Sequence, residues 1–555
     1  MGQSAFGSLD WFIVALFMVA LAVIVYFAAR KKEANAEDYF LSGRDAGWLA
    51  IGASIFASNI GSEHLVGLAS AGYENGLALA HWEFQSWIIV ILAWVFVPFF
   101  WQSQIVTTPE FLEKRYSSET RTFFSLISLV AYVLTKVSVT VFAGGIAIQE
   151  IFGIETLFGF DFFWVAAISL TIITGIFTVL GGMRAVLWTS VLQTPILVIG
   201  SVILLFAGLT KLGAGQGWLA GYVEMQAING ENMSLFRPAN DPDFPWPAVI
   251  GGSIIIGLWY WCTDQYIVQR VLSARDMTQA RRGAIFGGYL KLLPVFIFLF
   301  PGMIAYALVE KGMLVLPGGA DTAFPVMVRE LLPTGIKGIV LGGAIAALMS
   351  SLASLFNSTA TLFTVDFYQR LKPDLSNAHY VKVGRWATVA VVLLGIAWVP
   401  VLRSGLLGDS LYTALQRVQG LIAPSIVAVF FLGIFSNKIT PAAGYWGLVG
   451  GFLAGMFGLV LQFFPALASS NPVFAMIADM NWLYYCCLLL VLTIAGMVVI
   501  SLVTPAKSNA ELSGLTYSSM SAEQKATVAQ SYSKWDIANT VIIIGLIVII
   551  YVSFW

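Results

Sequence analysis

Apolar stretches of about 20 residues recur throughout this chain, and they restrict its fold more than any other feature. About 20 residues of α-helix cross the hydrocarbon core of a bilayer. Lipid offers no hydrogen bonds to a bare backbone, so each crossing is expected to be a helix. Charged residues make up 11% of the chain, against about 25% in soluble domains. The sequence therefore predicts an all-α membrane protein.

We predict fourteen transmembrane helices from these stretches. Their limits lie near residues 9–29, 47–70, 77–102, 121–150, 160–181, 185–211, 248–270, 283–309, 335–367, 384–403, 409–435, 441–464, 482–504 and 535–555. The first stretch has the length of a signal peptide, but its basic residues follow the apolar residues instead of preceding them. That order is wrong for a cleaved signal, so the stretch is predicted to be a first span.

Basic residues gather in alternate loops. Twenty lysines and arginines fall in one set of loops and six in the other set. The positive-inside rule places the richer set in the cytoplasm and both termini outside, in the extracellular space or periplasm. The outer loops contain no cysteine, which favours a bacterial inner membrane over another plasma membrane.

The remaining composition argues against several classes of protein. The net charge is −1, so nothing indicates a nucleic-acid partner. The three cysteines all lie in apolar stretches, which excludes a disulfide framework or a zinc-binding spacing. No nucleophile and base occur in a catalytic pattern, so an enzyme is not expected.

Two of the predicted spans have polar centres. The second contains the segment 57–64 and the seventh contains the segment 259–265. Without the first span, these two become the first and sixth of ten, and broken helices in matching positions are typical of inverted-repeat transporters with a midplane site. Two kinked structural helices are the alternative. The repeat divides the chain into a first accessory span and cytoplasmic loop (1–46), a first five-helix repeat (47–211), an extracellular loop (212–247), an inverted second five-helix repeat (248–435) and three accessory spans (436–555).

Charged and hydroxyl side chains inside the spans are candidates for the site. Glu83 and Lys291 lie deep in their spans, and buried charges usually mark a pathway or site. Asp264 fits a site and a snorkelling position equally well. The ninth span contains Ser350 and Ser351, whose oxygens suit a hard cation such as sodium. Serines in membrane helices also often bond their own backbone, so this assignment has a structural alternative.

A small polyhydroxylated solute requires paired polar groups for its hydroxyls and a flat apolar surface for its ring. The spans contain candidates of both kinds. The polar candidates are Asn59, His64, Glu83, Ser86, Lys291 and Gln416, and the aromatic candidates are Trp82, Tyr260, Trp261 and Tyr412.

Four long motifs resemble those of the sodium/glucose cotransporters, within the sodium:solute symporter family. They are the segments 52–62, 258–265, 288–292 and 349–364. The resemblance extends over essentially the whole chain. It implies a leucine-transporter-type fold, with a five-plus-five inverted repeat and accessory helices. It also implies a symporter that couples sodium influx to import of a neutral sugar by alternating access.

The resemblance also implies the roles of individual residues. Sodium would be bound by the backbone carbonyls of Ala57, Ile60 and Ala347 and by the hydroxyls of Ser350 and Ser351. The sugar would be bound by Asn59, His64, Glu83, Lys291 and Gln416, with Ser86 as a further candidate. Tyr260 would stack on the sugar as the inner gate with Trp261 beside it, and Leu68, Trp82 and Tyr412 would form the outer gate.

Three positions depart from the pattern of the resembled family. Gly257 stands where relatives often have Thr or Asn, and Thr140 stands where the animal glucose carriers have an acid. Ser190 replaces a typical aspartate, which puts a second sodium site in doubt and predicts one sodium per sugar. Alternatives for the function are a sodium symporter for myo-inositol or an acidic sugar, and a transporter-like sensor or channel.

Overall fold

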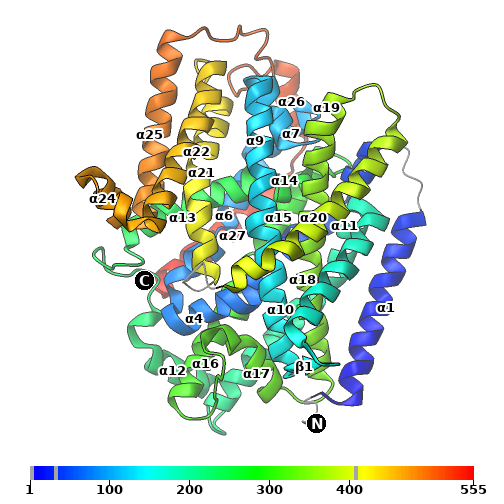
Figure 1. Cartoon of the computed structure of the whole chain (residues 1–555), viewed down its shortest axis with the longest axis vertical. Coiled ribbons are helices and arrows are strands. Elements are labelled where there is room, and N and C mark those ends of the chain that lie inside the picture. Colours follow the sequence, from blue (N-terminus) through cyan, green and yellow to red (C-terminus); the bar gives the residue numbers. More distant parts are fainter. Residues whose placement is uncertain (1–5, 31–34, 405–410) are drawn as a thin grey trace.

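The computed structural model describes residues 6–30, 35–404 and 411–555, nearly all of them in helices (Figure 1). The helices of the first half are α1 (Ser8–Arg30), α2 (Ala36–Leu41), α3 (Trp48–Asn59), α4 (Ala69–Asn75), α5 (Ala80–Glu83), α6 (Ser86–Ile91), α7 (Val97–Ser103), α8 (Thr108–Arg115), α9 (Ser118–Ala131), α10 (Ser138–Phe152), α11 (Phe162–Leu212) and α12 (Trp218–Asn229). Those that follow are α13 (Trp246–Cys262), α14 (Gln265–Leu272), α15 (Met277–Leu290), α16 (Phe300–Glu310), α17 (Ala323–Leu331), α18 (Ile336–Thr361), α19 (Gln369–Leu371), α20 (Asn377–Arg403), α21 (Leu411–Phe435), α22 (Pro441–Phe463), α23 (Pro465–Ala468), α24 (Pro472–Asp479), α25 (Trp482–Val503), α26 (Ala522–Gln530) and α27 (Lys534–Ser553).

Short segments of other kinds join these helices. The strands β1 (Thr156–Leu157) and β2 (Phe160–Asp161) form a small antiparallel hairpin between α10 and α11. The π-helical segments are Glu63–Leu68, Leu92–Phe96, Tyr132–Val137, Val295–Leu299 and Leu362–Tyr368. The 3₁₀ turns are Ser42–Arg44, Gly76–Leu79, Gly230–Met233 and Ala320–Thr322.

The predicted all-helical membrane fold is confirmed. Within the described chain, 11 helical segments are long and apolar enough to cross a bilayer, or 12 if the bent pair α13 and α14 is included. A total of fourteen crossings would require α11 to cross twice and α3 with α4 to form one crossing. Since α11 has 51 residues, it is about 75 Å long, more than twice the bilayer core. The number fourteen stays a prediction.

The position where α11 changes direction is Gly182. Its backbone has φ 50° and ψ −150°, outside the helical region, and only glycine adopts such angles at little cost. A Cβ at this position would lie 2.6 Å from the carbonyl oxygen of Tyr39. The break coincides with the predicted boundary between the spans 160–181 and 185–211.

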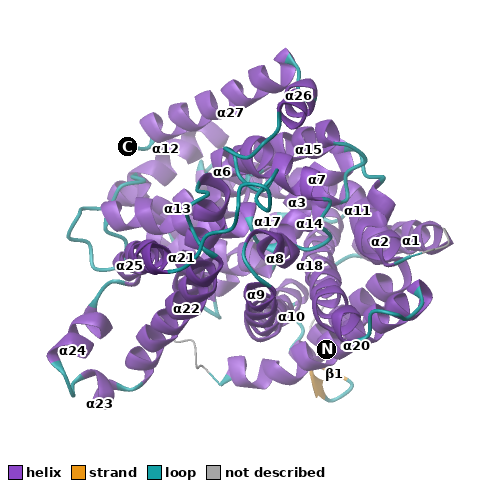
Figure 2. Ribbon diagram, turned by 90° about the horizontal axis from the view of Figure 1, so that it is seen from above, coloured by secondary structure: helices purple, strands orange, loops and turns teal. Residues whose placement is uncertain are grey.

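The two interruptions predicted from polar segments are present. Helix α3 ends at Asn59, Ile60 is extended, and the chain becomes helical again at Glu63. Helix α13 ends at Cys262, and α14 starts at Gln265 after a 43° bend. Both breaks lie inside the bundle. Figure 2 shows α3, α14 and α18 towards its middle, whereas α1, α24 and α27 lie at its rim.

Apolar side chains cover the outside of the peripheral helices. Leu502 and Val503 of α25 and Trp535 of α27 are about four-fifths exposed. Such residues are stable there only if lipid surrounds them. The central helices instead bury polar groups, so the bundle is apolar outside and polar at its breaks.

Gly182→Ala is expected to destabilise the protein by about 1–3 kcal/mol, because alanine is strained at this φ and its Cβ meets the Tyr39 carbonyl. Thermal unfolding of the detergent-solubilised protein measures the effect. Gly450→Ala is the matched control, since nothing lies within 4 Å of a Cβ there, and it should be neutral or slightly stabilising. Equal unfolding temperatures for the two variants would contradict this account of the break.

Candidate functional site

A buried cavity lies beside the break in α3. The space open to the centre of a water molecule is about 40 Å³, enough for a few waters. It is lined by Asn59, Glu63, His64, Trp82, Glu83, Gln85, Ile256, Tyr260, Trp261, Lys291, Tyr412, Leu415, Gln416 and Gln419. These residues come from five separate stretches of the chain, and only the folded bundle brings them together.

Glu83 is the centre of the polar contacts. Its Oε2 lies 2.5 Å from Lys291 Nζ and 3.4 Å from His64 Nε2, and Tyr412 donates a hydrogen bond of 2.8 Å to its Oε1. Lys291 also donates to Asn59 Oδ1 at 2.9 Å. All five side chains are buried. A buried charge is stable only with a partner, so the Glu83–Lys291 pair leaves this part of the cavity without net charge.

Several neutral polar atoms around the cavity have no hydrogen-bond partner in the described chain. They are Nδ1 of His64, Nε1 of Trp82 and Oε1 of Gln416. Buried polar atoms are nearly always satisfied. These atoms are therefore available to a polar molecule in the cavity.

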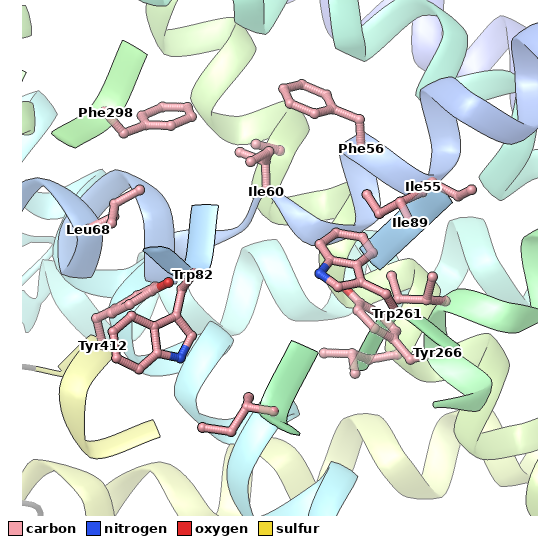
Figure 3. Close-up of a cluster of buried hydrophobic side chains, with 14 of the residues drawn as sticks. Ile55, Phe56, Ile60, Leu68, Trp82, Ile89, Trp261, Tyr266, Phe298 and Tyr412 are labelled. Carbon is pink, nitrogen blue, oxygen red and sulfur yellow. The ribbon is translucent and has the colours of Figure 1, made fainter. Parts of the chain in front are cut away.

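Four aromatic side chains line the cavity: Trp82, Tyr260, Trp261 and Tyr412. Figure 3 shows Trp82 and Tyr412 together on one side of Ile60 and Trp261 with Tyr266 on the other. Tyr260 accepts a 3.1 Å hydrogen bond from Asn59 at its hydroxyl. Trp82 stacks on Trp482, with ring centroids 6.0 Å apart and planes 25° apart. The cavity thus combines flat apolar surfaces with amides and a neutralised ion pair.

Most of the predicted solute-binding and gate residues line this cavity. Ser86 and Leu68 are buried but are not among the lining residues. Five lining residues were absent from the sequence prediction: the polar Glu63, Gln85 and Gln419 and the apolar Ile256 and Leu415. Gln419 follows Gln416 by three positions on one helix, a spacing that could have indicated it. The assigned roles themselves stay predictions.

Gln85 holds the indole of Trp261. The amide oxygen of Gln85 accepts a 2.9 Å hydrogen bond from Trp261 Nε1, and its amide nitrogen donates to the carbonyl of Ser253 at 2.8 Å. A Cβ on Gly257 would lie 2.7 Å from the Gln85 amide. The glycine that departs from the resembled family therefore gives Gln85 its space.

The five predicted sodium ligands lie where α3 and α18 meet. Residues Ala57 and Ile60 flank the break, and their carbonyls accept no backbone hydrogen bond outside helix α3 in the described chain. On α18, Ser350 lies 3.3 Å from Ser190 between hydroxyl oxygens. The Ser351 hydroxyl lies 3.1 Å from the Tyr266 hydroxyl. The helix break thus exposes acceptors next to two serines, as a site for a hard cation requires.

A second buried ion pair stabilises the other broken helix. Asp264 pairs with Lys136 and accepts a hydrogen bond from Tyr132. The Asp264 side chain is 2% exposed, so it does not snorkel to a membrane surface. Since Lys136 lies in the π-helical segment Tyr132–Val137, this pair also joins the second broken helix to the segment that precedes α10.

A helical bundle in which two broken helices meet at a buried polar cavity is the architecture of a secondary transporter. A family model confirms this class over residues 39–451, and the chain belongs to the sodium:solute symporter family.

The relatives support the same assignment. The sodium/glucose cotransporter 1 of Oryctolagus cuniculus is 37% identical over 528 residues, which cover 89% of this chain and 78% of that protein. The sodium/myo-inositol cotransporter 2 of the same species is 34% identical over 533 residues, covering 91% and 78%. A solved structure of a Na⁺-coupled sialic acid symporter, substrate-bound and outward-open, matches with a TM-score of 0.74 at 21% identity, covering 90% of this chain and 99% of that one.

These findings confirm several predictions. The protein is a multi-pass membrane transporter and not an enzyme, and sodium is its coupling ion. The structural match confirms that its fold is that of leucine-transporter-like symporters.

Gly257→Asn is expected to lower stability by about 1–3 kcal/mol and to impair sodium-driven uptake, because its side chain overlaps Gln85 and Ile88. The second substitution Gln85→Ala should restore part of both losses, since it vacates the same space. A double-mutant cycle in thermal stability measures the coupling. Strictly additive effects would show that the two positions do not compete for space.

Proposed function

We propose that this symporter imports a neutral polyhydroxylated solute, a hexose such as glucose or galactose, together with sodium by alternating access. The observation that carries the proposal is the chemistry of the central cavity. Glu83 and Lys291 cancel each other's charge, while His64 Nδ1, Trp82 Nε1 and Gln416 Oε1 have no hydrogen-bond partner among the described residues. Such a site favours hydroxyl groups and disfavours a net charge on the solute.

The small volume of the cavity indicates that the solute site is closed and too small for a hexose in this conformation. A space of about 40 Å³ for water centres holds only a few waters, whereas a hexose is several times larger. Binding therefore requires the outer gate residues Leu68, Trp82 and Tyr412 to move apart. The solute hydroxyls would then exchange with present contacts such as the Asn59–Lys291 bond, and Tyr260 would cover the inner side.

Myo-inositol is the second candidate solute. A sodium/myo-inositol cotransporter is nearly as similar as the glucose cotransporters, at 34% identity. Inositol is also neutral and rich in hydroxyls, so the charge of the cavity does not separate the two. We favour the hexose because the motifs resemble the glucose carriers over long segments.

Topology is part of the proposal. We infer fourteen crossings, with both termini outside the cell membrane and the two five-helix repeats at 47–211 and 248–435. The gathering of basic residues in alternate loops supports this orientation.

Uptake by the purified protein in liposomes tests the function. An inward sodium gradient should accelerate uptake of labelled glucose at least about tenfold over a potassium gradient. The reason is that sodium moving down its electrochemical gradient supplies the free energy for transport. Unlabelled galactose should compete strongly, myo-inositol weakly and sialic acid not at all, since the latter would bring a charge into a neutralised site. Stronger competition by myo-inositol than by galactose would make myo-inositol, and not a hexose, the favoured solute. Uptake that ignores sodium would overturn the proposal.

We expect one sodium ion per solute molecule. Ser190 provides a single neutral oxygen 3.3 Å from Ser350, and a second cation there would lack charge compensation. The voltage that cancels a fixed solute gradient gives the ratio directly, because two ions double the available free energy. Ser190→Asp should raise the number of sodium ions per solute molecule above one. The control variant Ser190→Ala should keep it at one. A ratio of two in the unaltered protein would contradict the prediction.

A further inference from the structure

The proposed sodium site has five ligands that are all neutral. Three are backbone carbonyls, of Ala57, Ile60 and Ala347, and two are the hydroxyls of Ser350 and Ser351. A cation among neutral groups inside a bundle keeps its full charge in a low-dielectric surrounding, which is costly. Ser190 does not reduce that cost. A negatively charged side chain near these ligands would reduce the cost of burying the cation.

Glu63 is that negative side chain. It is the third residue after Ile60, at the start of the π-helical segment that follows the break. From the position of a Cβ on Gly61, Glu63 Oε2 lies 2.6 Å away and Ser351 Oγ lies 3.0 Å away. Because residue 61 is a glycine, the space between the carboxylate and this serine is not filled by a side chain.

The two basic side chains that interact with Glu63, His64 and Lys136, each form their ion pair with another carboxylate, Glu83 and Asp264 respectively. Of the carboxylates around the two helix breaks, Glu83 pairs with Lys291, and Asp264 pairs with Lys136. Glu63 forms no ion pair or hydrogen bond among the described residues, and its Oε2 is buried. The buried Arg270 contacts the carbonyl of Tyr266 and not Glu63.

A small second cavity lies beside this carboxylate and is also lined by Ser351. It has about 20 Å³ for water centres and is lined by Glu63, Lys136, Thr140, Tyr260, Tyr266, Ser351, Leu355, Leu415 and Gln419. That volume suits one water or one bare cation. Glu63, Tyr260, Leu415 and Gln419 also line the central cavity. The carboxylate therefore lies between the space beside Ser351 and the solute cavity.

From this geometry we propose that Glu63 is a sixth ligand of the sodium ion and the residue that neutralises its charge. The proposal rests on the sodium site proposed above. Sodium would complete the charge pairing of the core, since it is the missing cation for the one unpaired carboxylate at these cavities in the described chain. It would also hold Glu63 next to Ser351 and away from the solute cavity, which joins ion binding to the shape of the solute site.

Binding of radioactive sodium to the purified protein, without any solute, tests the proposal. Glu63→Gln keeps the shape of the side chain and removes its charge, and it should raise the half-saturating sodium concentration at least about tenfold. Ser351→Ala should shift it in the same direction but less, because it removes a neutral ligand. Glu74→Gln is the matched control, since Glu74 is exposed at the far end of the same broken helix, and it should leave sodium binding unchanged.

The outcomes separate the inference from the function. If the unaltered protein binds sodium and Glu63→Gln binds it equally well, Glu63 is not a ligand. If the unaltered protein binds no sodium and its uptake ignores sodium, the proposed sodium site itself is wrong. Should Glu63→Gln fail to fold, Glu63→Asp decides: its shorter carboxylate should weaken sodium binding several-fold, and an unchanged value would overturn the inference.

Discussion

Hydrogen bonding of the backbone in lipid is the constraint on which the rest of this structure depends. A helix satisfies its own backbone groups, and an interrupted helix does not. Interruptions are stable only inside the bundle, where neighbouring helices surround them. The breaks after Asn59 and Cys262 are both enclosed in this way. Because a break leaves backbone carbonyls without helical partners, these positions become places where an ion can bind.

Charge pairing is the second consequence of burial. Glu83 with Lys291, and Asp264 with Lys136, bring four charges into the core without leaving net charge. Removing one member of such a pair is far more costly than the pair itself. The pairs also join segments distant in sequence, since Lys291 lies 208 positions from Glu83. They therefore fix the geometry around the cavity as well as its electrostatics.

Small residues decide which large ones fit near the site. Gly257 allows the Gln85 amide to hold Trp261, and Gly61 leaves open the space between Glu63 and Ser351. Each glycine acts by the absence of a side chain, so its effect depends on what lies opposite. A change in the residue opposite would therefore change how much space the glycine needs to leave free. Comparison of single positions with relatives misses this dependence.

The sequence by itself determined the membrane class, the two helix breaks and most of the residues around the cavity. The length of the apolar stretches, the basic residues in alternate loops and the polar segments inside spans are local patterns. They can be interpreted from neighbouring residues alone, because the transfer of each segment into lipid depends on its own composition. Only the tertiary structure decided the partners: that Asp264 is buried against Lys136, that Ser86 and Leu68 do not line the cavity, and that Glu63, Gln85 and Gln419 do. Contacts of this kind join residues far apart in the chain, and a side chain's direction at a break depends on the neighbouring helices, which no local pattern specifies.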